Sequence, residues 1–412
     1  MSTSIKVNSL QINAFRGIKH LELELSPRTN VFVGINGVGK TAILDCLTIL
    51  LSHLIKQITG IEERLYKDSD IYNGASETQN KITISIEERE LTWTSMIRKN
   101  GIHISSSLEE IQSNLLNSKA GIPLVVYYPV NRAVLDVDIA LNITQQPNFN
   151  QLTALELALE KKIDFQSFFE WFRNREDIEN EKRLENDANY RDRQLEAIRQ
   201  AIQTLMPGYT NLRVRRSPLR MTLNKQKQEL IIKQLSEGEK CLLALTGDLV
   251  RRLAIANPEL PNPLEGAAIV LIDEIELHIH PQWQRTIISK LEQTFPNCQF
   301  IISSHSPQII SEVKQPGRNV YFLRVTDEGI VANLVTDAYG KDSNFILEGL
   351  METSERPVDV KEEIIQLFRL IDDNQLNDAR NLLRHLEKKI GTQEPKLAKA
   401  EVLIHRKDIL GR

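Results

Sequence analysis

The residues with the clearest chemistry lie in the run GINGVGKT, Gly34–Thr41. It matches the pattern G-x-x-x-x-G-K-[ST], with an apolar strand-like segment before it and apolar residues at helical spacing after it. The glycines let backbone N–H groups curl around an anion at a helix N-terminus, where the helix dipole also favours negative charge. In such a loop Lys40 reaches the β- and γ-phosphates and Thr41 binds Mg²⁺. The sequence therefore predicts a site for ATP and Mg²⁺, with nucleotide contacts from Asn36, Gly37, Gly39, Lys40 and Thr41.

Two adjacent carboxylates follow a second apolar run, AAIVLI at 267–272. A continuous run of this kind is typical of a strand buried on both faces of a sheet. Such a strand would deliver the side chains that follow it to the sheet edge beside the phosphate loop. There Asp273 would hold Mg²⁺ through water, and Glu274 would orient and polarise the attacking water. A further buried strand is predicted at 298–304, and it ends at His305.

A third pattern, LSEGEK at 235–240, stands at the start of the segment EKCLLALTGDLVRRLAIA. Apolar residues recur in this segment at i, i+3 and i+4, which predicts a helix. Ser236 with Glu239 three positions later is the pattern of a capping box. Taken alone, the hexapeptide therefore predicts a helix start and no chemistry.

Taken in their order along the chain, these motifs resemble those of ABC-class ATPases. LSEGEK is similar to the signature LSGGQ, in which Ser236 and Gly238 occupy the matching places. Acidic Glu237 and Glu239 stand where transporters have Gly and Gln. The resemblance implies that Ser236, Gly238 and Glu239 complete the nucleotide site of another copy, so that the protein works as a homodimer or higher oligomer. It also implies that His305 is the switch histidine, which contacts and senses the γ-phosphate.

The segment before the phosphate loop points to one branch of this class. NAFRGI, residues 13–18, resembles the opening of SMC-related, DNA-repair and phage-defence ATPases, which adds Arg16 to the predicted nucleotide contacts. In that branch an insertion separates the two halves of the ATPase, as a long coiled coil in SMC proteins and a short helical lid in the defence enzymes. Mixed charges without long heptads at 133–209 favour the short lid. The implied fold class is α/β, an ABC-type P-loop ATPase head with an antiparallel β lobe, an inserted helical lid and C-terminal helices.

The C-terminal residues 371–412 resemble those of bacterial ATP-binding proteins related to the ATPase subunit of Septu phage-defence systems and to retron-associated ATPases. This resemblance covers nearly the whole chain. It implies an ATP-binding and ATP-hydrolysing regulatory or sensor subunit that controls a separate effector, which is an HNH nuclease in the Septu case. The related OLD nucleases carry a Toprim nuclease domain after the ATPase. The residues after His305 lack the spread of acidic motifs that such a metal site needs, so no nuclease domain is predicted here.

The sequence divides into four predicted segments. These are an N-terminal ATPase lobe with the phosphate loop at 1–132, a helical lid at 133–209, a C-terminal ATPase lobe at 210–340 and a helical extension at 341–412. Alternation at 212–234 predicts a hairpin that leads into the signature. Helices are predicted in the extension at 360–372, 376–390 and 396–409.

Composition sets broader limits. The chain has 412 residues, of which 41% are hydrophobic and 26% charged, values that are ordinary for a globular protein. No apolar run approaches a membrane span of roughly 20 residues and the N-terminus has no apolar signal core, so we expect a cytoplasmic protein without a membrane partner. The cysteines Cys46, Cys241 and Cys298 lie far apart, which argues against a disulfide framework. The net charge of −4 argues against a protein that coats polyanions generally.

The densest basic cluster leaves the function open. Arg213, Arg215, Arg216 and Arg220 could bind phosphate backbones or form a salt-bridged strand face. Nucleic acid is therefore a possible partner, reached directly or through the effector. The rival to a defence regulator is a DNA-repair or DNA-structure-sensing ATPase that binds DNA directly. A third reading is a structural scaffold that binds ATP for assembly and turns it over slowly.

Two smaller features remain in the sequence. Glu276, His278 and His280 follow the predicted strand at 267–272, but the pair His278 and His280 lacks a third ligand of known geometry, so a structural role is favoured over a zinc site. By resemblance this segment is the D-loop, which places His280 and Pro281 near a dimer interface. Arg132 follows a predicted strand and could face a nucleotide or an interface, or be an ordinary surface residue.

Overall fold

The computed structural model describes residues 4–99, 101–105, 121–130, 149–160, 163–185, 187–327, 329–351 and 354–410. The chain forms two compact units, Met1–Ser343 and Asn344–Arg412. Arg132 and the start of the predicted lid, 133–148, lie outside the described residues. The division of the sequence into four segments stays a prediction.

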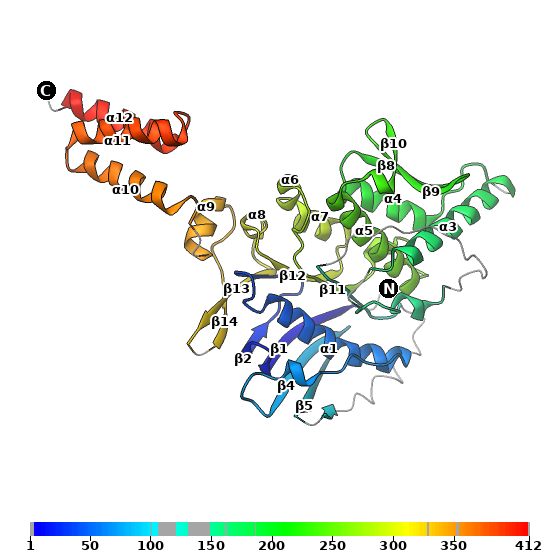
Figure 1. The fold of residues 1–412 in the computed structure, drawn as a ribbon. Coiled ribbons are helices and arrows are strands. Elements are labelled where there is room, and N and C mark those ends of the chain that lie inside the picture. Colours follow the sequence, from blue (N-terminus) through cyan, green and yellow to red (C-terminus); the bar gives the residue numbers. More distant parts are fainter. Residues whose placement is uncertain are drawn as a thin grey trace. The chain divides into compact units, whose positions relative to one another are not determined.

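A six-stranded sheet organises the first unit (Figure 1). Its strand order is β14-β13-β3-β12-β11-β7, and every neighbouring pair is parallel except β13 with β14. The strands are β3 Thr29–Val33, β7 Leu124–Tyr128, β11 Ala268–Ile272, β12 Cys298–Ser304, β13 Arg318–Thr326 and β14 Gly329–Leu334. All residues of β3, β7, β11 and β12 are buried, as their continuous apolar runs predict. Because parallel strands share one carboxyl edge, the segments that follow them meet there.

A second, antiparallel sheet covers one side of the long helix α1, Lys40–Thr59. Its order is β2-β1-β4-β5-β6, with β1 Ile5–Phe15, β2 Ile18–Glu24, β4 Glu77–Ile86, β5 Arg89–Arg98 and β6 Ile102–Ser105. The Trp93 indole N–H donates to the Leu50 carbonyl of α1 at 3.1 Å. The Gln299 side chain of β12 bonds both the N–H and the carbonyl of Val7 in β1, at 2.7 and 2.9 Å, and so joins the two sheets.

Among the described residues, α1 is the one helix with the length and apolar composition of a membrane span, and 83% of that stretch is buried inside the protein. Its burial between the sheets identifies α1 as the core helix of the unit. The phosphate loop therefore leads directly into a helix that is buried along most of its length.

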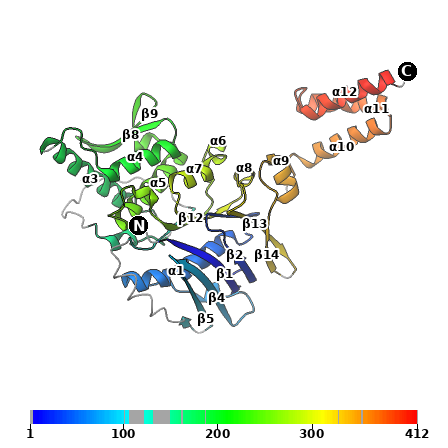
Figure 2. The same cartoon turned by 180° about the vertical axis from the view of Figure 1, so that it is seen from behind.

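The remaining helices of the first unit lie on the side of the six-stranded sheet opposite to α1 (Figures 1 and 2). They are α3 Phe165–Glu185, α4 Arg193–Leu205, α5 Glu237–Ala256, α6 Pro281–Gln284, α7 Ile287–Thr294 and α8 Pro307–Ile310. Helix α3 docks on α5 at Gly247, where an added Cβ would lie 2.7 Å from the Phe168 ring. The hairpin predicted at 212–234 gains a third strand, forming a separate sheet of β8 Tyr209–Arg216, β9 Leu219–Lys225 and β10 Gln228–Ile231 beside α3 and α4.

The second unit is built from three helices, α10 Val358–Asp372, α11 Leu376–Ile390 and α12 Pro395–Leu410. Leu367, Leu386, Leu397 and Ala400 form the centre of their shared apolar core. These helices begin and end within two residues of the predicted positions. A short helix α9, Ser343–Phe345, and a π-helical turn, Ile346–Leu350, precede them.

Candidate functional site

The phosphate loop has the backbone shape that an anion cradle requires. Gly34, Gly37 and Gly39 have φ angles of 152°, 81° and 102°, which residues with a Cβ rarely adopt. A Cβ on Gly34 would lie 2.8 Å from the Leu323 carbonyl oxygen, whereas one on Gly37 would meet nothing within 4 Å. The loop is therefore packed underneath at Gly34 and open at Gly37, and the α1 N-terminus follows it at once.

Lys40 lies across this loop. Its ammonium donates to the carbonyl oxygens of Gly34 and Ile35, at 2.8 and 3.0 Å. Burial lowers the pKa of Lys40, and the nearby carboxylates of Glu274, Glu276 and Asp273 act in the opposite direction. The structure thus brings the predicted lysine and the predicted carboxylates into one electrostatic cluster.

Thr41 and Asp273 meet although 232 residues separate them, and the Thr41 hydroxyl donates to Asp273 Oδ1 at 3.3 Å. The parallel register that pairs Ile272 with Ile302 places Asp273 beside Ser303. Buried Ser303 donates to Asp273 Oδ1 and accepts a bond from the Glu274 N–H, which is 2.8 Å away. A hydroxyl and a carboxylate held together in this way are the oxygen ligands that Mg²⁺ prefers. The donor set therefore fits the metal.

Glu274 has a left-handed backbone conformation with φ of 45°, which is unusual for a residue with a long side chain. Hydrogen bonds on both sides hold it, from Asp273 N–H to the Tyr128 carbonyl at 2.9 Å and from Ile275 N–H to the Ser303 carbonyl at 3.2 Å. Backbone strain that neighbouring bonds maintain is common at functional sites. Here it turns the chain sharply between the two adjacent carboxylates.

His305 is held by Glu276, a residue to which the sequence assigned only a structural role. Glu276 Oε1 accepts from His305 Nδ1 at 2.7 Å and from the His305 backbone N–H at 2.5 Å. The carboxylate is buried, while the histidine side chain is 43% exposed. This contact raises the pKa of His305. Burial alone would raise the pKa of the Glu276 carboxyl, but its hydrogen bonds to His305 outweigh burial and lower it. Glu276 is therefore a positioning residue that keeps an accessible imidazole oriented and favours its charged form.

We expect Glu276→Gln to reduce ATP turnover by about tenfold, the equivalent of about 1.4 kcal/mol, because His305 loses a charged hydrogen-bond partner. The His305 pKa falls in the variant, so the alkaline limb of the turnover–pH profile moves to lower pH. NMR of ¹³C-labelled histidine, with His305→Ala to assign the signal, measures this pKa directly. Glu312→Gln removes a more exposed carboxylate and is the control. An unchanged His305 pKa in Glu276→Gln contradicts the positioning role.

The signature forms the capping box that its sequence predicts. Ser236 accepts a 3.4 Å bond from the Glu239 N–H, and Glu239 Oε2 accepts a 2.8 Å bond from the Ser236 N–H. The other Glu239 oxygen accepts from Lys225 at 2.8 Å and from the Tyr209 hydroxyl. Partial burial alone would raise the Glu239 pKa, but these partners outweigh it and lower the pKa to about 2. Glu239 therefore has a structural role at the helix start, and its contact with a nucleotide stays a prediction, as do those of Ser236 and Gly238.

Gly238 has a packing reason of its own. A Cβ at this position would lie 2.1 Å from the His278 carbonyl oxygen, so the signature helix α5 packs directly against the loop that follows β11. His278 itself has a φ of 63°, and His280 Nδ1 accepts from the Gln282 N–H at 3.2 Å to cap α6. The described residues contain no cluster of three or more His, Cys, Asp or Glu side chains that could hold a metal ion, so His278 and His280 are not part of such a site. The place of His280 and Pro281 at an interface between copies stays a prediction.

Arg16 follows β1 with a φ of 49° and is anchored to the core helix. Its guanidinium donates to Asp45 of α1 at 2.6 Å and to Asp70 at 2.8 Å. These bonds fix the strand β1 end relative to the helix that starts with Lys40. Whether the guanidinium also contacts a nucleotide stays a prediction.

The glycine loop after a central parallel strand, the carboxylates after the strand two places away in the sheet, and the capped signature helix define an SMC-related, ABC-like P-loop ATPase. The model of the family described as "AAA domain, putative AbiEii toxin, Type IV TA system" matches residues 29–311, and the chain belongs to this family.

Proteins of retron and Septu systems are similar to this chain over most of its length. It is 31% identical to "Retron Vc95 probable ATPase" of Vibrio cholerae serotype O1 biovar El Tor, over 89% of this chain and 83% of that protein. It is 22% identical to "Septu protein PtuA" of Bacillus thuringiensis, over 74% of this chain and 72% of that protein. Among solved structures, the SMC head domain from Thermotoga maritima shares 15% identity with a TM-score of 0.47, over 80% of this chain and 99% of that chain.

Proposed function

We propose that this protein binds ATP with Mg²⁺ and hydrolyses it as the regulatory or sensor subunit of a bacterial anti-phage defence complex. In this role it forms a homodimer or higher oligomer through composite nucleotide sites and controls a separate effector, an HNH nuclease. The observation that carries the ATPase part is the meeting of the phosphate-loop residues Lys40 and Thr41 with Asp273, which comes from a distant part of the chain. The similarity to retron and Septu proteins supports the defence role.

Each group of residues has its own role in hydrolysis. Backbone N–H groups of the glycine loop and Lys40 bind the phosphates, and Thr41 and Asp273 hold Mg²⁺. The bound metal supplies charge neutralisation at the β- and γ-phosphate oxygens. Glu274 orients the attacking water, and His305 contacts the γ-phosphate with the orientation that Glu276 gives it.

Effector assays test this function. The purified protein should release phosphate from ATP in the presence of Mg²⁺, and it should change the activity of the proposed effector nuclease in an ATP-dependent way. Effector activity that ignores both the protein and ATP contradicts the regulatory role, while phosphate release alone still supports the ATPase site.

The alternative function is a DNA-repair or DNA-structure-sensing ATPase. It requires that the arginines between residues 213 and 220 bind DNA directly. Arg215 pairs with Glu229, and Arg216 pairs with Glu176 and Asp177, so two of the four arginines belong to a salt-bridged strand face. Ion pairs of this kind compete with phosphate for the same guanidinium groups. This observation favours the regulator.

We therefore expect the purified protein to bind duplex DNA weakly, with or without ATP. The measurement is DNA binding at two salt concentrations, repeated after Arg213, Arg215, Arg216 and Arg220 are all changed to Ala. A direct DNA-binding role would give affinity that falls steeply with salt, because each neutralised phosphate releases counterions. Tight, ATP-dependent binding that the four substitutions abolish would favour the repair-type alternative.

A further inference from the structure

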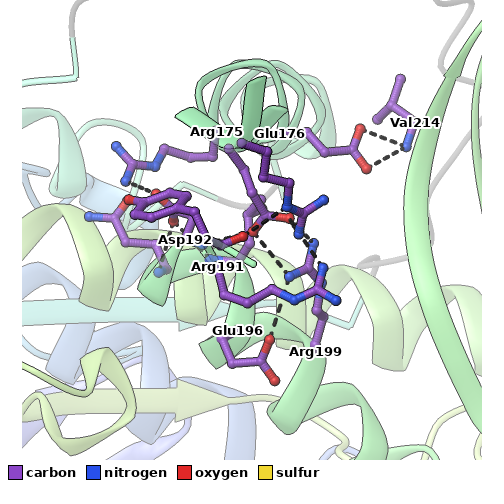
Figure 3. Close-up of polar contacts among 12 residues, drawn as sticks. Arg175, Glu176, Arg191, Asp192, Glu196, Arg199 and Val214 are labelled. Carbon is purple, nitrogen blue, oxygen red and sulfur yellow. Dashed lines mark hydrogen bonds and ion pairs between the residues drawn. The ribbon is translucent and has the colours of Figure 1, made fainter. Parts of the chain in front are cut away.

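A cleft of about 770 Å³ lies between helices α3 and α4 and strand β8, in the part of the chain inserted before the signature. None of its residues belongs to the nucleotide site described above. Figure 3 shows several of its charged side chains converging from α3 and from the segment around the α4 N-terminus. The arginines that line it are Arg183, Arg191, Arg199, Arg213, Arg215 and Arg216, and the acidic residues are Glu176, Asp177, Glu179 and Glu196. The lining therefore carries more positive than negative charge.

Glu179 anchors the floor of this cleft. Its side chain is only 1% exposed, and it accepts bonds from Arg183, from Arg199 at 3.1 Å and from the Asp192 N–H at 2.8 Å. Burial alone would raise the Glu179 pKa, but these donors outweigh it and lower the pKa. Burial alone would lower the Arg199 pKa, but the bond to Glu179 raises it. One ionised carboxylate thus fixes Arg183 and Arg199 in place before any ligand arrives, which reduces the entropy cost of ordering these two side chains.

Two arginines of the lining keep most of their donors available. Arg191 is 64% exposed, and its contact with Glu179 is a long one of 3.8 Å. The Arg213 side chain is exposed, and its guanidinium forms no hydrogen bond or close ion pair with any of the described residues, although its charge acts on Glu176 and Glu229. A guanidinium has five N–H donors in a planar fork, so the two side chains bring about ten donors to the rim.

The backbone of β8 is irregular where it lines the cleft. The register with β9 shifts between Thr210 and Arg213, and Asn211 has a φ of 53°. Bulges of this kind re-aim side chains next to binding sites. Thr210 and Asn211 also line the cleft and add uncharged donors between the arginines.

We propose that this cleft binds a phosphate-bearing ligand, either the phosphates of a free nucleotide or those of a nucleic-acid strand. Phosphate groups accept paired N–H bonds from arginine forks, and their clustered oxygens can accept from arginines of different elements at once. The volume lies in the range of about 300–1,000 Å³ that small-ligand sites occupy. An acidic protein segment is the less suitable occupant, because a carboxylate has one charge and two oxygens, whereas a phosphate group has more charge and more acceptor oxygens for the arginines.

Binding to the Lys40→Ala variant of the 412-residue chain tests this proposal, since we expect that substitution to remove nucleotide binding at the phosphate loop. The probes are tripolyphosphate, a 5′-phosphorylated single strand of about twelve nucleotides and a polyglutamate peptide of similar charge. Arg191→Glu with Arg213→Glu reverses the two rim charges without removing a structural ion pair at close range. The control, Arg220→Glu with Lys227→Glu, makes the same change of net charge at two exposed residues outside the cleft. Circular dichroism checks the fold of both.

We expect the rim variant to weaken phosphate binding by at least about tenfold and the control to change it by less than about threefold. A strand that binds far more tightly than tripolyphosphate, with steep salt dependence, identifies nucleic acid as the source, and similar affinities identify a free nucleotide. The proposal is overturned if neither phosphate probe binds, if both double variants lose binding equally or if polyglutamate binds more tightly. None of these results depends on ATP hydrolysis, so the proposed function stands or falls separately.

Discussion

Lys40→Ala should abolish ATP binding, whereas Glu274→Gln should retain it and accumulate the ATP-loaded protein. Lys40 is the cation that lies across the loop carbonyls, so its removal takes away the charge that meets the β- and γ-phosphates. Glu274 carries no comparable binding role, because its proposed work is to orient water. Its amide replacement keeps the size of the side chain and removes the acceptor that polarises the water.

The expected sizes are large. Lys40→Ala should raise the Kd for ATP by at least about a hundredfold, or about 2.7 kcal/mol. Glu274→Gln should lower kcat by about two to three orders of magnitude with Kd nearly unchanged. Titration with a fluorescent ATP analogue measures the first, and single-turnover phosphate release measures the second. Lys56→Ala, which changes a partly exposed lysine near the end of the same helix, is the control. Intact affinity in Lys40→Ala would remove the phosphate-loop assignment.

Residues that immediately follow an apolar run could be placed from the sequence. Asp273 and His305 each come directly after a buried strand, and Lys40 directly begins a helix, so local pattern was enough to gather them. The fold class came from the resemblance of the ordered motifs to those of ABC-class ATPases.

Residues whose role depends on register could not be placed in this way. Ser303 reaches Asp273 only because β11 and β12 pair in one particular alignment, and SS within FIISSH is otherwise an ordinary strand end. Glu276 was interpreted as a structural loop residue, and its contact with His305 also comes from this pairing. The pair of serines at the end of an apolar strand is the local signal that could have drawn attention to Ser303.

The inserted region was the hardest part to predict. Its arginines and carboxylates are spread over α3, α4 and β8, and only tertiary packing shows which pairs neutralise each other. From composition the region has the appearance of a solvated face. In the structure, Glu179 is almost fully buried in the middle of a charged cleft, which no helical periodicity indicates.

The second large effect concerns where Ser236 acts. Its polar contacts in the described structure stay within the signature turn, with the N–H groups of Glu239 and Lys240 and with the Glu239 carboxylate, and the residue is exposed. The exposed N-terminus of α5 is therefore suited to contact a nucleotide that is bound by another copy of the chain. Gly238 is a poorer position for a test, because any side chain there would collide with the His278 carbonyl of the same chain and disturb the fold.

We therefore expect Lys40→Ala and Ser236→Arg each to eliminate ATPase activity, and an equal mixture to recover part of it. In a dimer with composite sites, a mixed pair contains one site built from an intact phosphate loop and an intact signature. Random mixing makes about half of the dimers mixed, each with one working site of two, so recovery should approach about a quarter of the wild-type rate when one site can act alone. Circular dichroism and size-exclusion chromatography must first show that both variants fold and assemble together. A mixture that stays inactive under those conditions would mean that each site is complete within one chain, since Ser236 would then lack a role across the interface.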